Sequence, residues 1–412
     1  MPRTGEKFPV TVIGAGVVGL ATATALVERG AEVTILDRSA ELGGNASWLA
    51  GGMLAPFCEG ESAPASVVER GAKALDWWAA RVPGVARNGT LVLAPPRDVG
   101  EIDRFAARTR EWERVDADAI VGLEPDLAGR FRKGLFFRSE GHLDPRVAMA
   151  ALRGELLRRG VEIRFGQDVT REPPLPLSAG EGWGEGLRPS RPSSGAKARR
   201  KTGVFDALSR HLLPQAGEGL IVDCRGYSAR DALPELRGVR GEMLLVRTRE
   251  IALKRPVRLL HPRIPLYVVP RADGLFMIGA TMIESADKGG VSARSAIELL
   301  SAAWALHPAF GEAEIVEMRA DVRPAFPDNE PRIVERGGRI YVNGFYRHGF
   351  LLSPHYAERA ADQIAASMPK ANSLHLGRWL VENTPRGVEI ELPSRADNLR
   401  DPFELFDDRD FR

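Results

Sequence analysis

The sequence predicts an α/β fold, and three observations lead to this prediction. A strand, a glycine turn, a helix and a second strand follow one another between residues 9 and 37. A capped helix and another strand occupy residues 144–165. From residue 220 to 368, strand patterns continue and are interrupted by helical ones. A chain of 412 residues is long enough for one large domain or two interlocked domains with a full core.

The first of these stretches has the order that a dinucleotide site requires. Its first strand is apolar and β-branched, which is typical of a buried parallel strand, and its Ala-rich helix ends at a glycine. The parts in chain order are strand Val10–Ile13, turn glycines Gly14, Gly16 and Gly19, helix Val17–Arg29 with Gly30 after it, strand Glu32–Leu36, and Asp37.

Each glycine of the turn has a physical role in such a site. Gly14 permits the tight turn, Gly16 lets a pyrophosphate approach the backbone, and Gly19 lets the helix pack closely on the sheet. The N–H groups and the dipole at the helix N-terminus attract phosphate. Asp37 can accept hydrogen bonds from ribose hydroxyls, and its charge disfavours the 2′-phosphate of NADP.

Two other interpretations of this stretch have less support. A glycine pattern also occurs in ordinary strand-to-helix turns, but here a strand, a helix and an acid flank it. Pro9 to Val27 carries no charge, as a membrane span would. Its glycines and threonines, and the immediate return to a strand pattern, argue against one. We therefore expect no transmembrane segment.

Composition and charge argue against several classes of protein. The hydrophobic content of 44% is ordinary for a globular chain, and Met1 to Lys7 is too short and polar for a signal peptide. Cys58 and Cys224 suggest no disulfide framework, so a cytoplasmic location is expected. No Cys/His cluster has metal-ligand spacing. The net charge is +2, and residues 172–218 alone contribute seven Arg/Lys against five Asp/Glu, so the remainder has no basic footprint for nucleic acid.

The rest of the chain contains further helix and strand patterns. Asp144 followed by Pro145 is a typical helix start, and Gly160 ends that helix. Residues 39–56 form a loop rich in Gly, Ala and Ser, which a ligand can approach closely. The expected helices are 65–82, 98–114, 145–159, 293–306 and 354–368, and the expected strands are 87–94, 134–138, 161–165, 220–224, 240–247, 266–270, 275–280, 315–323 and 339–342.

Residues 172–218 interrupt these patterns. The segment is rich in Pro, Gly, Ser and charge, so it cannot bury enough apolar surface to offset its ordering entropy. It is interpreted as a disordered insertion between two strands, and its basic cluster Arg199–Lys201 as a solvated segment. Residues 371–412 are expected to be a C-terminal tail.

Seven motifs, in one order, carry a resemblance to a known family. The chain resembles the flavin-dependent amine and amino-acid oxidases of the D-amino acid oxidase superfamily, and within it the glycine oxidases of thiamine biosynthesis. The resemblance covers roughly residues 8–170 and 220–368. Its motifs are GAGVVG (14–19), LAGGMLAP (49–56), GHLDPR (141–146), VRGEMLLV (239–246), LYVVPRADGLFMIGATM (266–282), DVRPAFPDNEPRI (321–333) and NGFYRHGFLLSP (343–354).

The resemblance implies non-covalent FAD. It implies a Rossmann-type FAD-binding domain with a discontinuous α+β substrate domain, whose sheet is mostly antiparallel. The FAD domain would take 8–60, 140–235 and 324–370, and the substrate domain 61–139 and 236–323. The residues that match the family's flavin contacts are Gly14, Ala15, Gly16, Val17, Val18, Gly19, Asp37, Arg38, Ala46, Ser47, Gly52, Met53, Val169, Phe345, Tyr346, Arg347, His348, Gly349, Phe350 and Leu351.

The family's substrate residues match Arg323, Tyr267 and Arg347, with Met282 near the pocket wall. The chemistry of these side chains agrees with that role. A guanidinium can grip a carboxylate bidentately, which makes Arg323 the expected anchor, and Tyr267 can donate a second hydrogen bond. Without the resemblance, Arg323 also fits a position in a surface turn, and Tyr267 also fits a tyrosine of the core. His348 is interpreted as a residue behind the reacting groups, with a base near the amine as the alternative.

The implied reaction is oxidation of a small amino acid, glycine by preference. Hydride passes to flavin N5 to give an imine, and oxygen, the expected acceptor, is reduced to hydrogen peroxide. The imine would serve thiazole synthesis. The alternatives are a D-amino acid or sarcosine-type oxidase or dehydrogenase, a tRNA-modifying flavoprotein and a flavin-binding protein without turnover. Relatives are often homo-oligomers. Departures from the family pattern are the 172–218 insertion, Asp223–Gly226 and His348.

Overall fold

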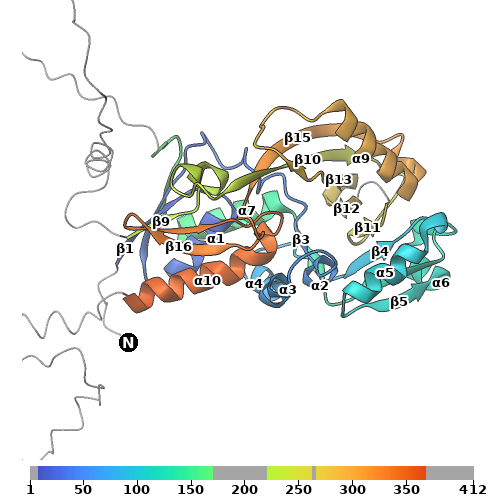
Figure 1. The fold of residues 1–412 in the computed structure, drawn as a ribbon, viewed down its shortest axis with the longest axis horizontal. Helices are drawn as coiled ribbons and strands as arrows, with labels where there is room; N and C mark the ends of the chain where they lie inside the picture. Colours follow the sequence, from blue (N-terminus) through green and yellow to red (C-terminus); the bar gives the residue numbers. More distant parts are fainter. Residues whose placement is uncertain (1–7, 170–219, 262–265, 368–412) are drawn as a thin grey trace, which may run out of the picture. The chain divides into compact units, whose positions relative to one another are not determined.

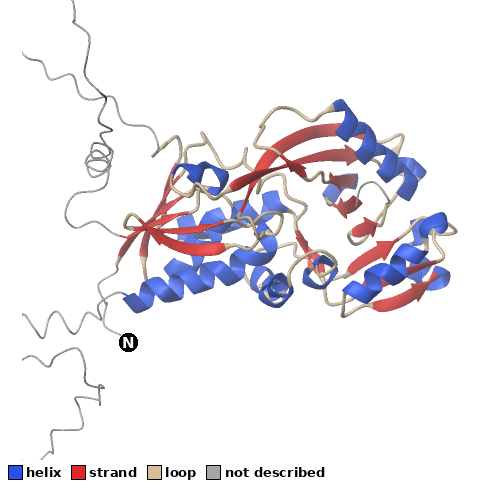
Figure 2. Cartoon of the chain, viewed as in Figure 1, coloured by secondary structure: helices blue, strands red, loops and turns tan. Residues whose placement is uncertain are grey.

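The computed structural model describes residues 8–169, 220–261 and 266–367, which are the coloured parts of Figure 1. The expected insertion at 172–218 and the tail at 371–412 lie outside these residues. Lys7–Ser367 forms one compact unit. The α/β fold class is confirmed, because helices and strands alternate around two large sheets (Figure 2). The division into an FAD domain and a substrate domain stays a proposal.

The first sheet has six strands in the order β16-β17-β9-β1-β2-β8. All its pairings are parallel except that of β16 with β17. Helix α1 packs against β1 and β2, and α7 and α10 pack against α1. The bounds are β1 (Pro9–Ile13), α1 (Val17–Glu28), β2 (Glu32–Leu36), α7 (Pro145–Arg158), β8 (Glu162–Arg164), β9 (Leu220–Asp223), β16 (Arg332–Arg336), β17 (Arg339–Asn343) and α10 (Gly349–Ser367).

The strand–turn–helix–strand predicted near the start of the chain is confirmed as β1, α1 and β2. Gly14 has a φ of +104°, a conformation that glycine adopts without strain, and a Cβ there would lie 2.7 Å from the carbonyl oxygen of Cys224. A Cβ on Gly19 would lie 1.8 Å from the carbonyl oxygen of Gly14. The helix therefore starts this close to the sheet only because both positions lack a side chain.

The second sheet has nine strands, with β14-β10-β13-β12-β11-β4-β6-β5 in order and β15 paired with β10. Its pairings are antiparallel except that of β11 with β4. Its strands are β4 (Thr90–Leu93), β5 (Glu113–Asp116), β6 (Lys133–Phe137), β10 (Arg237–Arg247), β11 (Val257–Leu259), β12 (Leu266–Pro270), β13 (Leu275–Gly279), β14 (Ile283–Glu284) and β15 (Glu314–Ala325).

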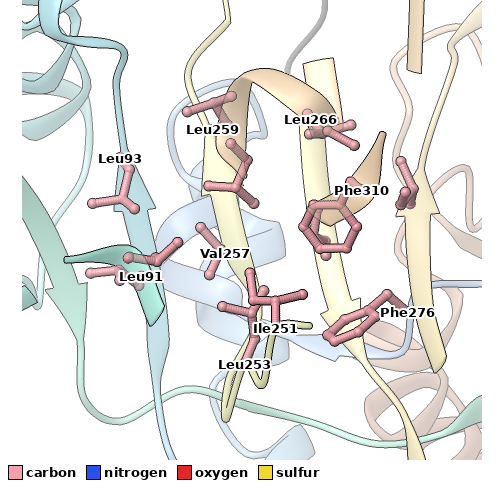
Figure 3. Packing of buried hydrophobic residues seen from close by; sticks show 14 of the residues in the cluster. Leu91, Leu93, Ile251, Leu253, Val257, Leu259, Leu266, Phe276 and Phe310 are labelled. Carbon is pink, nitrogen blue, oxygen red and sulfur yellow. The ribbon is translucent and has the colours of Figure 1, made fainter. Parts of the chain in front are cut away.

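The strands of the second sheet alternate between two environments. Leu266 and Val268 of β12, with Phe276 and Ile278 of β13, join a large apolar core with helix α9 (Ala293–Leu306). Figure 3 shows Leu266 and Phe276 in this core. The residues between them face the other way, so Tyr267 of β12 packs with Met243, Val269 and Met277 in a separate cluster. The two-residue period of a strand thus places Tyr267 on the face opposite α9.

Short elements connect the sheets. Strands β3 and β7 pair antiparallel, while α5 packs against β6 and α6 against β5 and β6. Their bounds are β3 (Met53–Leu54), α2 (Pro56–Glu59), α3 (Ala65–Gly71), α4 (Ala74–Ala79), α5 (Gly100–Arg108), α6 (Ala117–Leu123) and β7 (Gly141–His142).

Three predicted helices have different bounds in the structure. The single helix predicted at 65–82 is wrong, because α3 ends at Gly71, where a Cβ would lie 2.8 Å from the Leu351 side chain. The helix predicted at 98–114 stops at Arg108, and a turn with Glu111 at a φ of +62° leads into β5 instead. Helix α10 begins at Gly349 rather than at Pro354.

Pro354 lies inside α10, which local sequence rules disfavour. A proline has no N–H to donate to the carbonyl four residues earlier, here that of Phe350. The indole Nε1 of Trp78 donates to that carbonyl instead, at 2.8 Å. A residue from α4 therefore satisfies the backbone group that Pro354 leaves open, and the helix continues to the end of the described chain.

Candidate active site

A large cavity begins at the turn between β1 and α1 and extends to the second sheet. Its nucleotide end includes Gly14, Gly16 and Asp37, and its far end includes Tyr267 and Arg323. A smaller cavity adjoins it, since both are lined by Tyr267, Arg323 and Arg347. The sequence predicted these residues from separate motifs, and the fold brings them to one connected space.

The nucleotide end of the large cavity combines the N-terminus of α1 with a carboxylate that the glycine turn holds in place. The Ser47 hydroxyl accepts from Val17 N at 3.1 Å at the start of α1. The Asp37 carboxylate accepts from Ala15 N at 2.6 Å and from Ser39 N at 2.7 Å, which holds it against the glycine turn. A dipolar helix end and an oriented acid therefore line the same cavity, so these residues fit the adenosine and pyrophosphate parts of FAD.

The other end of the large cavity is closed by the turn from β17 into α10. Tyr346 N donates to the carbonyl of Pro324 at 2.7 Å, and Phe345 forms a β-bridge with Ala325. These bonds tie the turn to the end of β15. Arg323 on the strand and Arg347 on the turn consequently line the same space, although they belong to separate segments of the sequence.

Arg323 presents its guanidinium to both cavities. Within the described residues, it donates one hydrogen bond, from Nη1 to the carbonyl oxygen of Thr281 at 3.0 Å. Gly241 on the neighbouring strand β10 leaves room for the group, because a Cβ there would lie 2.1 Å from Nη2. The remaining donors of Arg323 are therefore available to an anion in the cavity.

Tyr267 lies beside Arg323 in the lining of both cavities. Its ring packs against Gly51 and Gly279, where a Cβ would lie 3.0 Å and 3.1 Å from ring carbons. Burial raises the pKa of the Tyr267 hydroxyl, against the lowering effect of Arg323. The hydroxyl consequently stays protonated near neutral pH and can donate a hydrogen bond.

A charged cluster, which we call the Glu59 cluster, stands at the wall of the smaller cavity. It consists of Glu59, Arg258, Arg347 and His348, all of which line that cavity. Glu59 Oε2 lies 2.6 Å from Nη2 of Arg347 and 2.9 Å from Nε2 of His348, and Arg258 lies 3.7 Å from Oε1. Burial alone would raise the pKa of Glu59, but Arg347, His348 and Arg258 together hold it well below its ordinary range.

Sequence reasoning missed Glu59 and Arg258. Both lie outside the matching motifs, and Glu59 ends the short helix α2, where an acid is unremarkable in a local pattern. Nothing in the local sequence indicates that Arg258 is buried, since it lies on the unpredicted strand β11. Their pairing depends on residues about 200 positions apart, which only the tertiary structure reveals.

Most predicted site residues line one or both cavities. Ala15 and Gly19 line neither, and contribute through a backbone bond to Asp37 and through close helix packing. The Met282 sulfur accepts from the Tyr346 hydroxyl at 3.3 Å at the rim of the smaller cavity. The residues on the cavity walls are Gly14, Gly16, Val17, Val18, Asp37, Arg38, Ala46, Ser47, Gly52, Met53, Val169, Tyr267, Met282, Arg323, Phe345, Tyr346, Arg347, His348, Gly349, Phe350 and Leu351.

The described residues contain neither a candidate metal site nor a candidate membrane-spanning helix. No group of three or more His, Cys, Asp or Glu side chains among them could hold a metal ion. Within the same residues, every helix is too short or too polar to cross a membrane.

Known proteins share this fold and much of this sequence. The chain is 48% identical over 361 residues to a Rhizobium etli protein named thiamine biosynthesis oxidoreductase ThiO. The match covers 86% of this chain and 96% of that protein. It is 26% identical to a glycine oxidase of Geobacillus kaustophilus, over 92% of this chain and 100% of the relative.

Solved structures agree on the fold. The crystal structure of a glycine oxidase from Bacillus cereus superposes with a TM-score of 0.66 at 22% identity, covering 88% of this chain and 99% of that one. The sequence model of the DAO family, described as "FAD dependent oxidoreductase", matches residues 9–363. Together with the cavity that fits FAD, this match identifies the chain as a member of the DAO family and as an FAD-dependent oxidoreductase.

Proposed function

We propose that this enzyme oxidises a small amino acid, glycine by preference, to the corresponding imine. Oxygen is the proposed acceptor and hydrogen peroxide the second product. The observation that carries the proposal is the pairing of Arg323 with Tyr267 where the cavity that fits FAD meets the smaller cavity. A guanidinium with open donors and a protonated phenol form a receptor for one carboxylate.

The protein's part in this reaction is to hold and aim the substrate. Arg323 binds the carboxylate through two N–H groups, and the Tyr267 hydroxyl donates to it from the side. Because Arg323 and Tyr267 line both cavities, a carboxylate held by them would leave the α-carbon next to the cavity that fits FAD. Bound FAD supplies the acceptor for the hydride that leaves the α-carbon as the amine becomes an imine.

The substrate class is supported by the names of similar proteins. Relatives from Pseudomonas aeruginosa and Geobacillus kaustophilus are named glycine oxidases, and the Rhizobium etli relative is named for thiamine biosynthesis. We infer from these names that the imine product enters thiazole synthesis for thiamine.

We also propose that FAD is held without a covalent bond. Cys224 lines the large cavity, but burial and the charge of Asp223 raise the pKa of its thiol, so little thiolate is available to attack the flavin. Precipitating the protein with acid should release all of the yellow flavin to the supernatant. Colour that stays with the pellet would indicate a covalent link.

The direct test of the reaction is anaerobic mixing of the purified holoenzyme with glycine, sarcosine, D-alanine or D-proline. Glycine should bleach the flavin absorbance fastest, and admitting air should restore it and form hydrogen peroxide. Faster bleaching by a larger amine would replace glycine with a D-amino acid or sarcosine-type substrate. Bleaching by none of the four would contradict the proposal and favour a tRNA-modifying flavoprotein or a flavin-binding protein without turnover.

A further inference from the structure

We propose that Glu59 is a specificity-determining residue that neutralises Arg347 and thereby restricts the enzyme to substrates with a single carboxylate. The inference rests on the proposed function and adds a selection between mono- and dicarboxylates to it. It starts from the charges that line the smaller cavity.

Cations dominate the wall of the smaller cavity. Arg258, Arg323 and Arg347 line it, and Glu59 is the one acid among the described lining residues. Without that acid, the cavity would present several guanidinium groups to a substrate. Such a surface favours ligands with more than one negative charge.

The two arginines nearest the substrate differ in their partners. Arg347 is bonded to the Glu59 carboxylate at 2.6 Å and to the Ser62 hydroxyl at 2.7 Å. Arg323 donates to the carbonyl oxygen of Thr281, its hydrogen-bond partner among the described residues. Only Arg323 is therefore ready to receive a carboxylate, and Arg347 already has one from the protein.

Glu59 is held firmly in this role. Its carboxylate also lies 2.9 Å from Nε2 of His348 and 3.7 Å from Arg258, and it is ionised because Arg347, the hydrogen bond to His348 and Arg258 hold its pKa low. A second substrate carboxylate would have to displace an ion already bound on three sides. Removing one partner of such a partly buried pair leaves the other charge uncompensated and open to an external anion.

The test compares ligand binding to wild type and to Glu59→Gln, which keeps the shape of the side chain and removes its charge. Acetate and malonate serve as probes, and the perturbation of the FAD absorbance in the holoenzyme gives each Kd without turnover. Malonate should gain at least tenfold relative to acetate in Glu59→Gln. An unchanged ratio of the two Kd values would overturn the proposal.

The matched control is Glu61→Gln. Glu61 lies two residues further along the same segment and pairs with Arg258 at 3.1 Å and with Arg108 at 3.2 Å, away from Arg347. Like Glu59→Gln, this substitution removes one negative charge next to Arg258. The ratio of malonate to acetate affinity should stay at the wild-type value. An equal shift in Glu61→Gln would mean that net charge, and not the Glu59–Arg347 pair, sets the preference.

If Glu59→Gln does not fold, Glu59→Ala replaces it, and malonate should again gain at least tenfold relative to acetate. A double variant then tests whether this gain depends on Arg347. The double variant Glu59→Gln with Arg347→Gln removes both charges of the pair, and it should prefer acetate as wild type does. A malonate preference in the double variant would contradict the proposal. Glycine reduction of the wild-type flavin is measured alongside, so failure of the proposed reaction is recognised independently of the binding ratio.

Discussion

Arg323 is the residue on which substrate binding depends most in this interpretation. Replacing it with Ala removes the charged fork while leaving the nucleotide end of the large cavity intact. Hydrogen bonds to charged groups contribute about 1.5–3 kcal/mol each, so the KM for glycine should rise roughly 100-fold or more. Steady-state kinetics give the KM, and absorbance gives the flavin content, which should stay at the wild-type level.

The control for this variant is Arg319→Ala, on the same strand β15. Arg319 is half exposed and lies 3.7 Å from Glu317, outside both cavities. Its KM should match wild type. A KM for Arg323→Ala within threefold of wild type would remove the carboxylate-anchor role.

Glu140 should make the stability of the protein depend on pH. Its carboxyl is fully buried and accepts from Cys58 N at 2.7 Å, and burial raises its pKa from 4.5 to about 8. Between these pH values the folded chain keeps a proton that the unfolded chain releases. The free energy of unfolding therefore falls as pH rises through this interval, by on the order of 5 kcal/mol, and levels off above it.

The variant Glu140→Gln cannot lose that proton, so its advantage over wild type should grow from about pH 5 to about pH 8. Urea unfolding across this interval measures the difference. Glu113→Gln is the control, because a hydrogen bond from Arg138 lowers the pKa of this exposed acid and moves its titration to more acidic pH. Parallel curves for wild type and Glu140→Gln would show that Glu140 titrates normally.

At the scale of single residues, local motifs were sufficient for side chains that belong to the glycine turn and to the matching segments. They were insufficient for the Glu59 cluster. Glu59 owes its ionisation and its position to Arg258, Arg347 and His348, which come from a different strand and from the turn before α10. Charges paired across such distances leave no periodic signal in the chain.

Among the elements, helix α1 depends on the absence of a side chain at Gly19. The variant Gly19→Ala places a methyl group 1.8 Å from the carbonyl oxygen of Gly14, so the helix must move off the turn. Overpacking of this kind costs about 1–3 kcal/mol, and the displaced turn should bind FAD weakly. The flavin content of the purified variant and its Tm measure both effects.

The control Gly154→Ala lies within α7, where a Cβ would meet nothing within 4 Å. Alanine favours a helix over glycine by about 1 kcal/mol, so this variant should be as stable as wild type or more so, with full flavin. Normal flavin content in Gly19→Ala would mean that the turn tolerates the shift and that close packing is unnecessary for the cofactor.

Element boundaries were predictable where capping signals are local. Asp144 accepts from Arg146 N at 2.8 Å and starts α7 as its sequence indicated. Helix α10 shows the opposite case. Its first turn was not predicted. Pro354 has no N–H for the carbonyl of Phe350, and that carbonyl accepts instead from Trp78 of the distant helix α4.

In the molecule as a whole, the large cavity lies between the two sheets. It is lined by the β1–α1 turn of the first sheet and by β10, β12 and β15 of the second. A ligand bound only by the folded protein stabilises it by about 2.7 kcal/mol when present at 100 times its Kd. Removing FAD should therefore lower the Tm of the compact unit, and adding FAD back should restore it.

Differential scanning calorimetry of the holoenzyme and the stripped protein makes this comparison on the full chain. Both sheets should unfold in one transition that moves with FAD concentration. A transition that ignores FAD, or two transitions of which only one responds, would show that the cavity does not couple the sheets.

The sequence alone was sufficient for the α/β class, the order of most elements and the glycine turn between β1 and α1. Each depends on neighbours within about one turn or one strand, where the period of apolar residues and the position of glycines are direct evidence. Only the tertiary structure brought Arg323 of β15, Arg347 of the turn and Glu59 of α2 to one cavity. That arrangement follows from strand pairing and from the bonds between Pro324 and Tyr346, which no local pattern encodes.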